Sequence, residues 1–113
     1  MASPRRIEKL NNLLREELGK ILDREMDFPA GTFVTITSVD ISPDVHYADV
    51  FISIISQEPE NVLAILGGNI YHIQQELNQH LRMRPVPRIK FLLDEKEYRR
   101  EKIEKKLAEI KGE

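Results

Sequence analysis

The chain contains no cysteine and no tryptophan, and its only aromatic residues among 113 are four phenylalanines and three tyrosines. The absence of cysteine excludes disulfide bonds and thiolate metal ligands. No apolar run approaches the roughly 20 residues that a helix needs to cross a bilayer. Met1 to Arg6 leads directly into an amphipathic pattern without the apolar segment of a secretory signal. We therefore expect a cytoplasmic protein that is not bound to a membrane.

The remaining composition is typical of one soluble globular domain. Hydrophobic residues make up 41% of the chain and charged residues 32%, which is not the composition of a disordered chain. A length of 113 residues suffices for one hydrophobic core but not for two. The patterns indicate no large exposed apolar face, so we expect a monomer.

Positive charge is missing from the middle of the chain. Residues 25–66 contain seven acidic residues and neither lysine nor arginine. The flanking residues 1–24 and 67–94 both contain more basic than acidic residues, although the net charge of the whole chain is −2. A net charge near zero can therefore hide one positive face, which a binding partner with phosphate groups would favour. The alternative is that these charges only keep ordinary surfaces solvated.

Hydrophobic periodicity predicts an α+β fold. The patterns predict, in chain order, a helix, two strands, a helical region with an interruption, a strand and a final helix, over residues 4–24, 32–41, 47–56, 57–81, 88–93 and 95–111. We expect the two first strands to form an antiparallel hairpin, and the helices to cover one face of a small sheet. Residues 1–94 would form the folded domain. Residues 95–113 would form a charged helix that is either docked on the surface or partly mobile.

Several local features refine this prediction. The apolar phase of the first strand changes near Thr37-Ser38, which suggests a β-bulge. Ser42-Pro43-Asp44 is typical of a type I turn. Gly67-Gly68-Asn69 interrupts a helical stripe and predicts a kink. Gly19 is unfavourable inside the first helix, and we interpret it as a sign of a close packing contact.

Four cations gather where the second helical region ends and the last strand begins. Pro85 and Pro87 end the helix and delay the strand, because proline has no backbone N–H to donate. Strand alternation then places Ile89, Phe91 and Leu93 on one face of the sheet. The candidate phosphate-binding residues of this corner are Arg82, Arg84, Arg88 and Lys90. A second basic patch at the N-terminus consists of Arg5, Arg6 and Lys9.

These cations have a simpler explanation as well. Basic side chains on an exposed sheet face could pair with glutamates of the last helix. Such surface pairs contribute only about 0–1 kcal/mol, so stability alone explains four of them poorly. The helical stretch before the corner also carries Gln74, Gln75, Asn78 and Gln79, a polar outer face that could hydrogen-bond sugar or phosphate.

The chain has little that resembles a catalytic centre. Asp40, Asp44, Asp49 and His46 lie close together in the sequence, but we expect strand alternation to scatter their side chains between the two sheet faces. His72 and His80 are eight residues apart, too far for the i, i+4 spacing of a helical metal pair. There is no phosphate-binding loop, nucleophile elbow or cysteine. We therefore expect a protein that is not an enzyme and that needs no cofactor or metal.

The order of elements and several motifs resemble the ribosome-binding factor A family of bacteria. The motifs follow an arginine-rich amphipathic helix and are residues 34–44 (VTITSVDISPD), 48–53 (ADVFIS) and 81–91 (LRMRPVPRIKF), closed by Asp94. The resemblance covers nearly the whole chain. It implies a type II KH-like domain, with a three-stranded mixed sheet packed against helices, a helix-kink-helix element and a C-terminal helix; the kink would be the interruption at Gly67, Gly68 and Asn69. Family members lack the Gly-x-x-Gly loop with which ordinary KH domains hold RNA, as does this chain.

The resemblance also implies a function. Members of the family bind the immature 30S ribosomal subunit near the 5′-terminal helix and neck of its 16S rRNA. They assist late maturation and 5′-end processing, particularly in the cold, and their release is associated with a small-subunit GTPase. Two alternatives remain open: a KH-type protein that binds single-stranded RNA generally, or a module that binds another protein.

Overall fold

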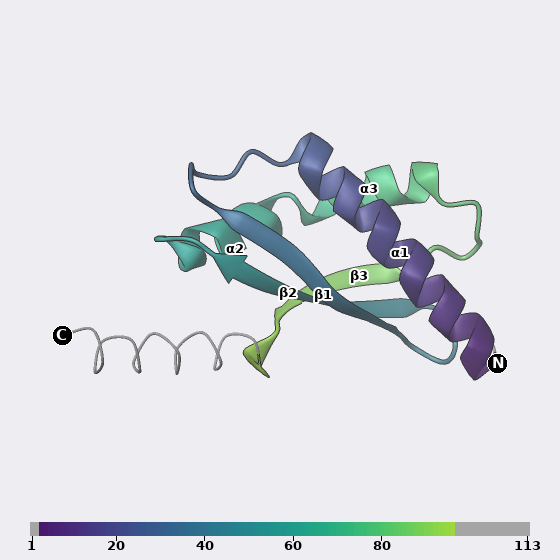
Figure 1. The fold of residues 1–113 in the computed structure, drawn as a ribbon. Helices are drawn as coiled ribbons and strands as arrows, with labels where there is room; N and C mark the ends of the chain where they lie inside the picture. The colour runs from purple at the N-terminus through teal and green to yellow at the C-terminus, as the bar shows by residue number, and fades with distance from the viewer. Residues whose placement is uncertain (1–2, 97–113) are drawn as a thin grey trace.

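The computed structural model describes residues 3–96, and Figure 1 shows three helices packed on a three-stranded sheet. The elements are α1 (Pro4–Glu25), β1 (Phe33–Ile41), β2 (Tyr47–Ile55), α2 (Pro59–Gly68), α3 (Ile70–His80) and β3 (Arg88–Leu93). The predicted order of these elements is confirmed. Most of the expected last helix lies outside the described residues, so the division of the chain at residue 94 stays a prediction.

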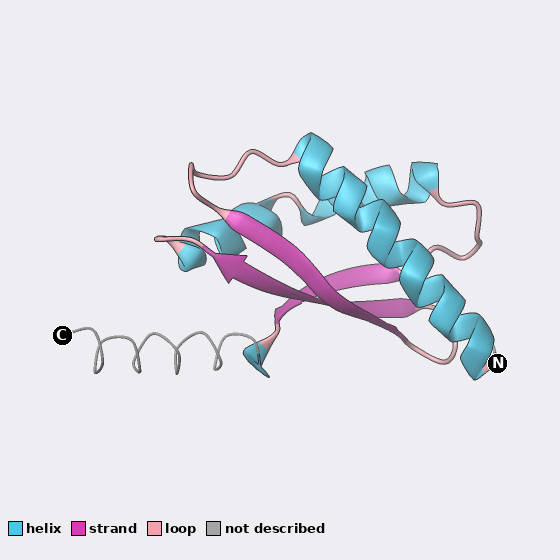
Figure 2. Ribbon diagram, viewed as in Figure 1, coloured by secondary structure: helices cyan, strands magenta, loops and turns pink. Residues whose placement is uncertain are grey.

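The sheet is mixed, with β2 in the centre. β1 and β2 pair antiparallel, and β2 and β3 pair parallel. The register of β1 against β2 shifts between Ile36 and Ser38, so the predicted bulge is present. All three helices lie on the same face of the sheet (Figure 2). The opposite face is covered by no described element.

The core fills the space between the sheet and the helices. β2 contributes alternate residues to it, from Ala48 to Ile54, as period-2 patterning predicts. The helices contribute buried residues at helical spacing, among them Leu14 and Leu18 from α1 and Ile73 and Leu77 from α3. The side chains of Ile89, Phe91 and Leu93 pack into this core from β3. The predicted faces of β3 are therefore correct.

Each outer strand of the sheet is bonded to a helix through one amide side chain. The side chain of Asn11 in α1 accepts a hydrogen bond from Ile41 N–H of β1 over 3.0 Å. At the other edge Gln74 of α3 accepts from Ile89 N–H over 2.9 Å and donates to the Pro87 carbonyl over 3.0 Å. The prediction that Gln74 belongs to a polar outer face free to bond sugar or phosphate is therefore wrong, because its amide satisfies the backbone of β3.

The β1–β2 connection is a tight turn. Val45 N–H donates to the Ser42 carbonyl over 2.8 Å, and Val45 itself has a φ of 63°. The Asp44 carboxylate accepts from the Ser42 hydroxyl over 2.6 Å and from His46 N–H over 3.1 Å, and these bonds hold the pKa of Asp44 below its usual value. Side-chain bonds to a neighbouring backbone N–H are typical of aspartate in turns. They support a conformation that a β-branched residue rarely adopts.

The helical region after β2 breaks at a single residue. α2 ends at Gly68, Asn69 lies between the helices, and α3 begins at Ile70. The Asn69 amide nitrogen donates to the Ile65 carbonyl over 2.7 Å, which satisfies part of the end of α2. The interruption thus lies within the predicted Gly67-Gly68-Asn69 segment. Neither glycine adopts a positive φ, so asparagine makes the turn.

The expectation for Gly19 is wrong. A Cβ atom built at this position would meet nothing within 4 Å, apart from chain neighbours and the backbone of its own helix. No close packing contact therefore requires a glycine here.

Candidate nucleic-acid interface

A cleft of about 480 Å³ runs between α3 and β3. Its polar lining comes from α3, with Gln74, Gln75 and Asn78, and its apolar floor includes Ile70 and Ile89. The lining also includes Tyr71, Val86 and Arg88. Amide groups, an aromatic ring and a guanidinium can hydrogen-bond, stack on and neutralise parts of a nucleotide. The cleft therefore has the chemistry of a site for single-stranded or looped RNA.

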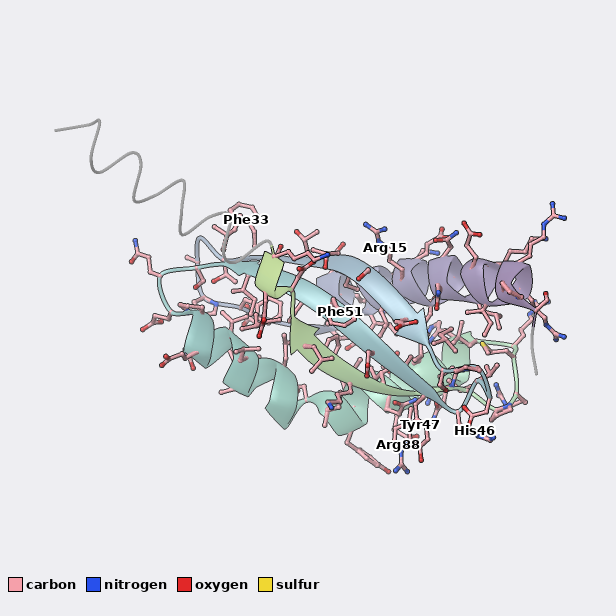
Figure 3. The ribbon with its side chains drawn as sticks, turned by 90° about the horizontal axis from the view of Figure 1, so that it is seen from below. Arg15, Phe33, His46, Tyr47, Phe51 and Arg88 are labelled. Carbon is pink, nitrogen blue, oxygen red and sulfur yellow. The ribbon has the colours of Figure 1, made fainter. Side chains whose placement is uncertain are left out.

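Arg88 lies between this cleft and a second depression. The second depression measures about 520 Å³ and is lined by Asp44, His46, Tyr47, Val86 and Arg88. Arg88 is the register partner of Tyr47, and its N–H donates to the His46 carbonyl over 2.9 Å. Figure 3 shows Arg88, Tyr47 and His46 close together at one end of the sheet. Of the predicted cations, Arg88 therefore lines two hollows at once.

Lys90 lies in a less positive environment. It is exposed on the open face of the sheet, next to its register partner Asp49. Asp49 is in turn the register partner of Asp40. The prediction that strand alternation separates Asp40 from Asp49 is therefore wrong, because the register across the bulged hairpin places both residues directly opposite each other. Two carboxylates near Lys90 weaken its attraction for phosphate.

The guanidinium of Arg84 bonds to the backbone of the protein itself. Its guanidinium donates to the carbonyls of Leu81 and Met83 over 2.8 and 2.7 Å, and to that of Asn78 over 3.4 Å. These carbonyls lie at and beyond the end of α3, where helix carbonyls lack partners and a positive charge is favourable. Arg84 therefore stabilises the corner, whereas Arg82 is exposed in the same connection.

The N-terminal cations lie toward the same end of the molecule. Arg5, Arg6 and Lys9 are exposed in the first turns of α1. In Figure 1 the start of α1, the β1–β2 turn and the α3–β3 connection are all at the right-hand end. Within the described residues 3–96, no ion pair involves any of the seven predicted RNA-binding cations.

Sequence reasoning missed the exposed aromatic residues. Tyr71 is 76% exposed beside the cleft, and Tyr47 is 60% exposed beside Arg88. Phe33 is 66% exposed at the other end of the open sheet face, with Phe51 between them (Figure 3). Large rings left in solvent are candidates for stacking on bases. Strand alternation puts Phe51 on the face opposite to Val50 and Ile52, so this signal was present in the sequence.

No described helix is long and apolar enough to cross a membrane. The fold and the cleft together define the class of this protein as an α+β domain of the type II KH-like kind, without a Gly-x-x-Gly loop. A family model described as ribosome-binding factor A matches residues 6–107. The chain belongs to the ribosome-binding factor A family.

Relatives and solved structures agree with this assignment. Ribosome-binding factor A of Thermodesulfovibrio yellowstonii is 34% identical over 108 residues, which are 95% of this chain and 92% of the relative. That of Natranaerobius thermophilus is 43% identical over 93 residues, 80% of this chain and 70% of the relative.

Among structures, ribosome-binding factor A of Thermus thermophilus matches with a TM-score of 0.68 and 24% identity, over 77% of this chain and 94% of that one. Coordinates of the Thermus thermophilus factor fitted into a map of its complex with the 30S subunit match with a TM-score of 0.64 and 26% identity, over 74% and 90% of the two chains.

Proposed function

We propose that this protein binds the immature 30S ribosomal subunit through its 16S rRNA and assists late maturation. The observation that carries the proposal is the position of Arg88, which has no carboxylate partner among residues 3–96 and lines both hollows at one end of the sheet. The fitted 30S complex of the Thermus thermophilus factor supports the choice of partner.

The contacts follow from the geometry of the site. The cleft between α3 and β3 receives an unpaired or looped segment of rRNA, with the amides of Gln75 and Asn78 toward the bases and Tyr71 available for stacking. Arg88 and Arg82 neutralise phosphates beside the cleft, and Lys90 adds a weaker contact on the open face of the sheet. Arg5, Arg6 and Lys9 extend the contact along α1. Arg84 holds the α3–β3 connection in place, and its charge adds to the positive potential of this surface. Such a surface recognises folded RNA by shape and charge.

The finer steps belong to the same proposal. We place the contact at the 5′-terminal helix and neck of the 16S rRNA, where the protein supports processing of the 5′ end, particularly in the cold. A small-subunit GTPase releases it afterwards. No step requires the protein to make or break a covalent bond, so we propose that it acts as a non-enzymatic, monomeric, cytoplasmic assembly factor.

A charge reversal at Arg88 tests the proposal. Hydrogen bonds to charged groups contribute about 1.5–3 kcal/mol, so Arg88→Glu should weaken binding to 30S subunits by about tenfold or more. Arg15→Glu, which changes an exposed arginine of α1 away from both hollows (Figure 3), is the matched control and should bind as the wild type does. Co-sedimentation with immature subunits measures both variants, and circular dichroism checks their folding.

The result also separates the alternatives. If Arg88→Glu co-sediments with subunits as well as Arg15→Glu does, the proposed RNA-binding site at Arg88 is wrong. A general KH-type RNA-binding protein would bind short single-stranded oligonucleotides tightly and show no preference for subunits.

In cells depleted of their own ribosome-binding factor A, Arg88→Glu should leave unprocessed 16S precursor that wild-type protein and Arg15→Glu clear.

A further inference from the structure

Three potential metal ligands meet where the end of α1 lies against the first turns of α3. His72 Nε2 is 3.4 Å from Oε2 of Glu25, the last residue of α1. Glu76 follows His72 by four residues on α3. One ligand atom from each of Glu25, His72 and Glu76 lies within 4.8 Å of the other two.

This donor set suits a divalent cation of the zinc class. Zinc binds imidazole nitrogen and carboxylate oxygen at about 2.0–2.2 Å, which places neighbouring ligand atoms of a tetrahedral site about 3.3–3.5 Å apart. The distance between His72 and Glu25 already has this value. The i, i+4 spacing of His72 and Glu76 is the spacing at which one helix presents two ligands to a metal.

His80 and Arg24 complete the surroundings. His80 Nδ1 lies 2.7 Å from the carbonyl of Glu76 and 3.8 Å from its carboxylate, outside the group of three atoms. The Arg24 guanidinium lies 3.2 Å from Glu25 Oε1 and 3.4 Å from Glu76 Oε2. Arg24 thus neutralises the two carboxylates that a cation would bind, and it competes with that cation.

We propose that Glu25, His72 and Glu76 form a binding site for a zinc-class divalent cation, with water completing the coordination. The cation would clamp the end of α1 to α3 and displace the guanidinium of Arg24 into solvent. The side chains of Glu25 and Glu76 are only 28% and 19% exposed, so the fold already limits where their carboxylates can lie. The sequence pattern alone did not reveal the site, because the chain brings Glu25 to His72 only through the packing of α1 on α3.

Titration of the untagged full chain with zinc chloride tests this site by calorimetry. We expect saturable binding of one ion to the wild type. His72→Gln, which removes a ligand, should weaken the affinity by about tenfold or more. His46→Gln changes an exposed histidine of the β1–β2 turn and should bind zinc as the wild type does.

A third variant should change the zinc affinity in the opposite direction. Arg24→Gln removes the competing cation and should tighten zinc binding, because no guanidinium then neutralises the two carboxylates. Bound zinc should also raise the melting temperature of the wild type but not that of His72→Gln. Equal affinities of wild type and His72→Gln, or an equal loss in His46→Gln, would overturn the proposal. So would an affinity that Arg24→Gln leaves unchanged or weakens.

Discussion

Arg84 and Arg88 show how residues of one type, four positions apart, come to act differently. Arg84 follows the end of α3, where three backbone carbonyls accept hydrogen bonds from its guanidinium. Arg88 begins β3, where its N–H donates to the His46 carbonyl and its side chain lines both hollows. Charge counting treats both as candidate phosphate ligands, whereas the local backbone decides which of them remains available.

Gly19 gives a prediction at the scale of one residue. Because no atom outside its own helix and chain neighbours approaches the position of a Cβ, Gly19→Ala should raise the free energy of unfolding, by up to about 1 kcal/mol. Urea denaturation followed by circular dichroism measures the change.

A second glycine provides the control for this measurement. Gly31 has a φ of +78°, a conformation that costs an alanine roughly 1–2 kcal/mol, so Gly31→Ala should destabilise the protein. If Gly19→Ala destabilised the protein as well, α1 would have a packing constraint that the structure does not contain.

The difference between predicted and observed residues has a physical cause. Alternation placed Ile89 in the core and Arg88 outside, because strand geometry depends only on sequence spacing. The pairing of Asp40 with Asp49 depends instead on the register of two strands across a bulge. The vacant surroundings of Gly19 depend on where α1 meets the sheet. Features that require two elements to meet could not be derived from periodicity within one of them.

At the scale of elements, the sheet is joined to its helices by more than apolar packing. Asn11 and Gln74 each connect a helix to an outer strand through its backbone. An unpaired edge is a template for aggregation, so natural sheets cover or pair it. The sequence predicted the helices, the strands and the break near Asn69, but it identified these amides only as polar residues on helices.

Replacing Gln74 should loosen β3 from α3. Gln74→Leu keeps a similar volume but leaves Ile89 N–H and the Pro87 carbonyl without their partner, so the free energy of unfolding should fall by about 1–3 kcal/mol. Gln75→Leu is the matched control, since Gln75 lines the same cleft but its side chain makes no hydrogen bond within residues 3–96. Its effect should stay within about 0.5 kcal/mol. Equal losses in both variants would show that the edge contact contributes nothing of its own.

At the scale of the whole molecule, the distribution of charge matters more than its sum. The net charge of −2 would repel RNA if it were spread evenly. The acidic central segment instead supplies β1, β2 and the turn between them, whereas the cations lie on the start of α1, the α3–β3 connection and β3. Asp40, Asp44 and Asp49 nevertheless lie close to part of this cationic surface, which should limit non-specific binding and favour RNA whose shape meets the cleft.

The salt dependence of subunit binding tests this view of the molecule. Each phosphate that a cation neutralises releases counterions, so the logarithm of the affinity should fall linearly with the logarithm of the KCl concentration, by about 0.7–0.9 per contact. Measured at constant magnesium, the slope for the wild type should be steep. Arg88→Gln should reduce the magnitude of this slope by the contribution of about one phosphate contact, whereas Arg15→Gln should leave the slope unchanged. A slope near zero with full affinity would contradict phosphate recognition. It would favour instead a protein partner docked on the open sheet face, over the exposed rings of Phe33 and Tyr47 and the half-buried ring of Phe51.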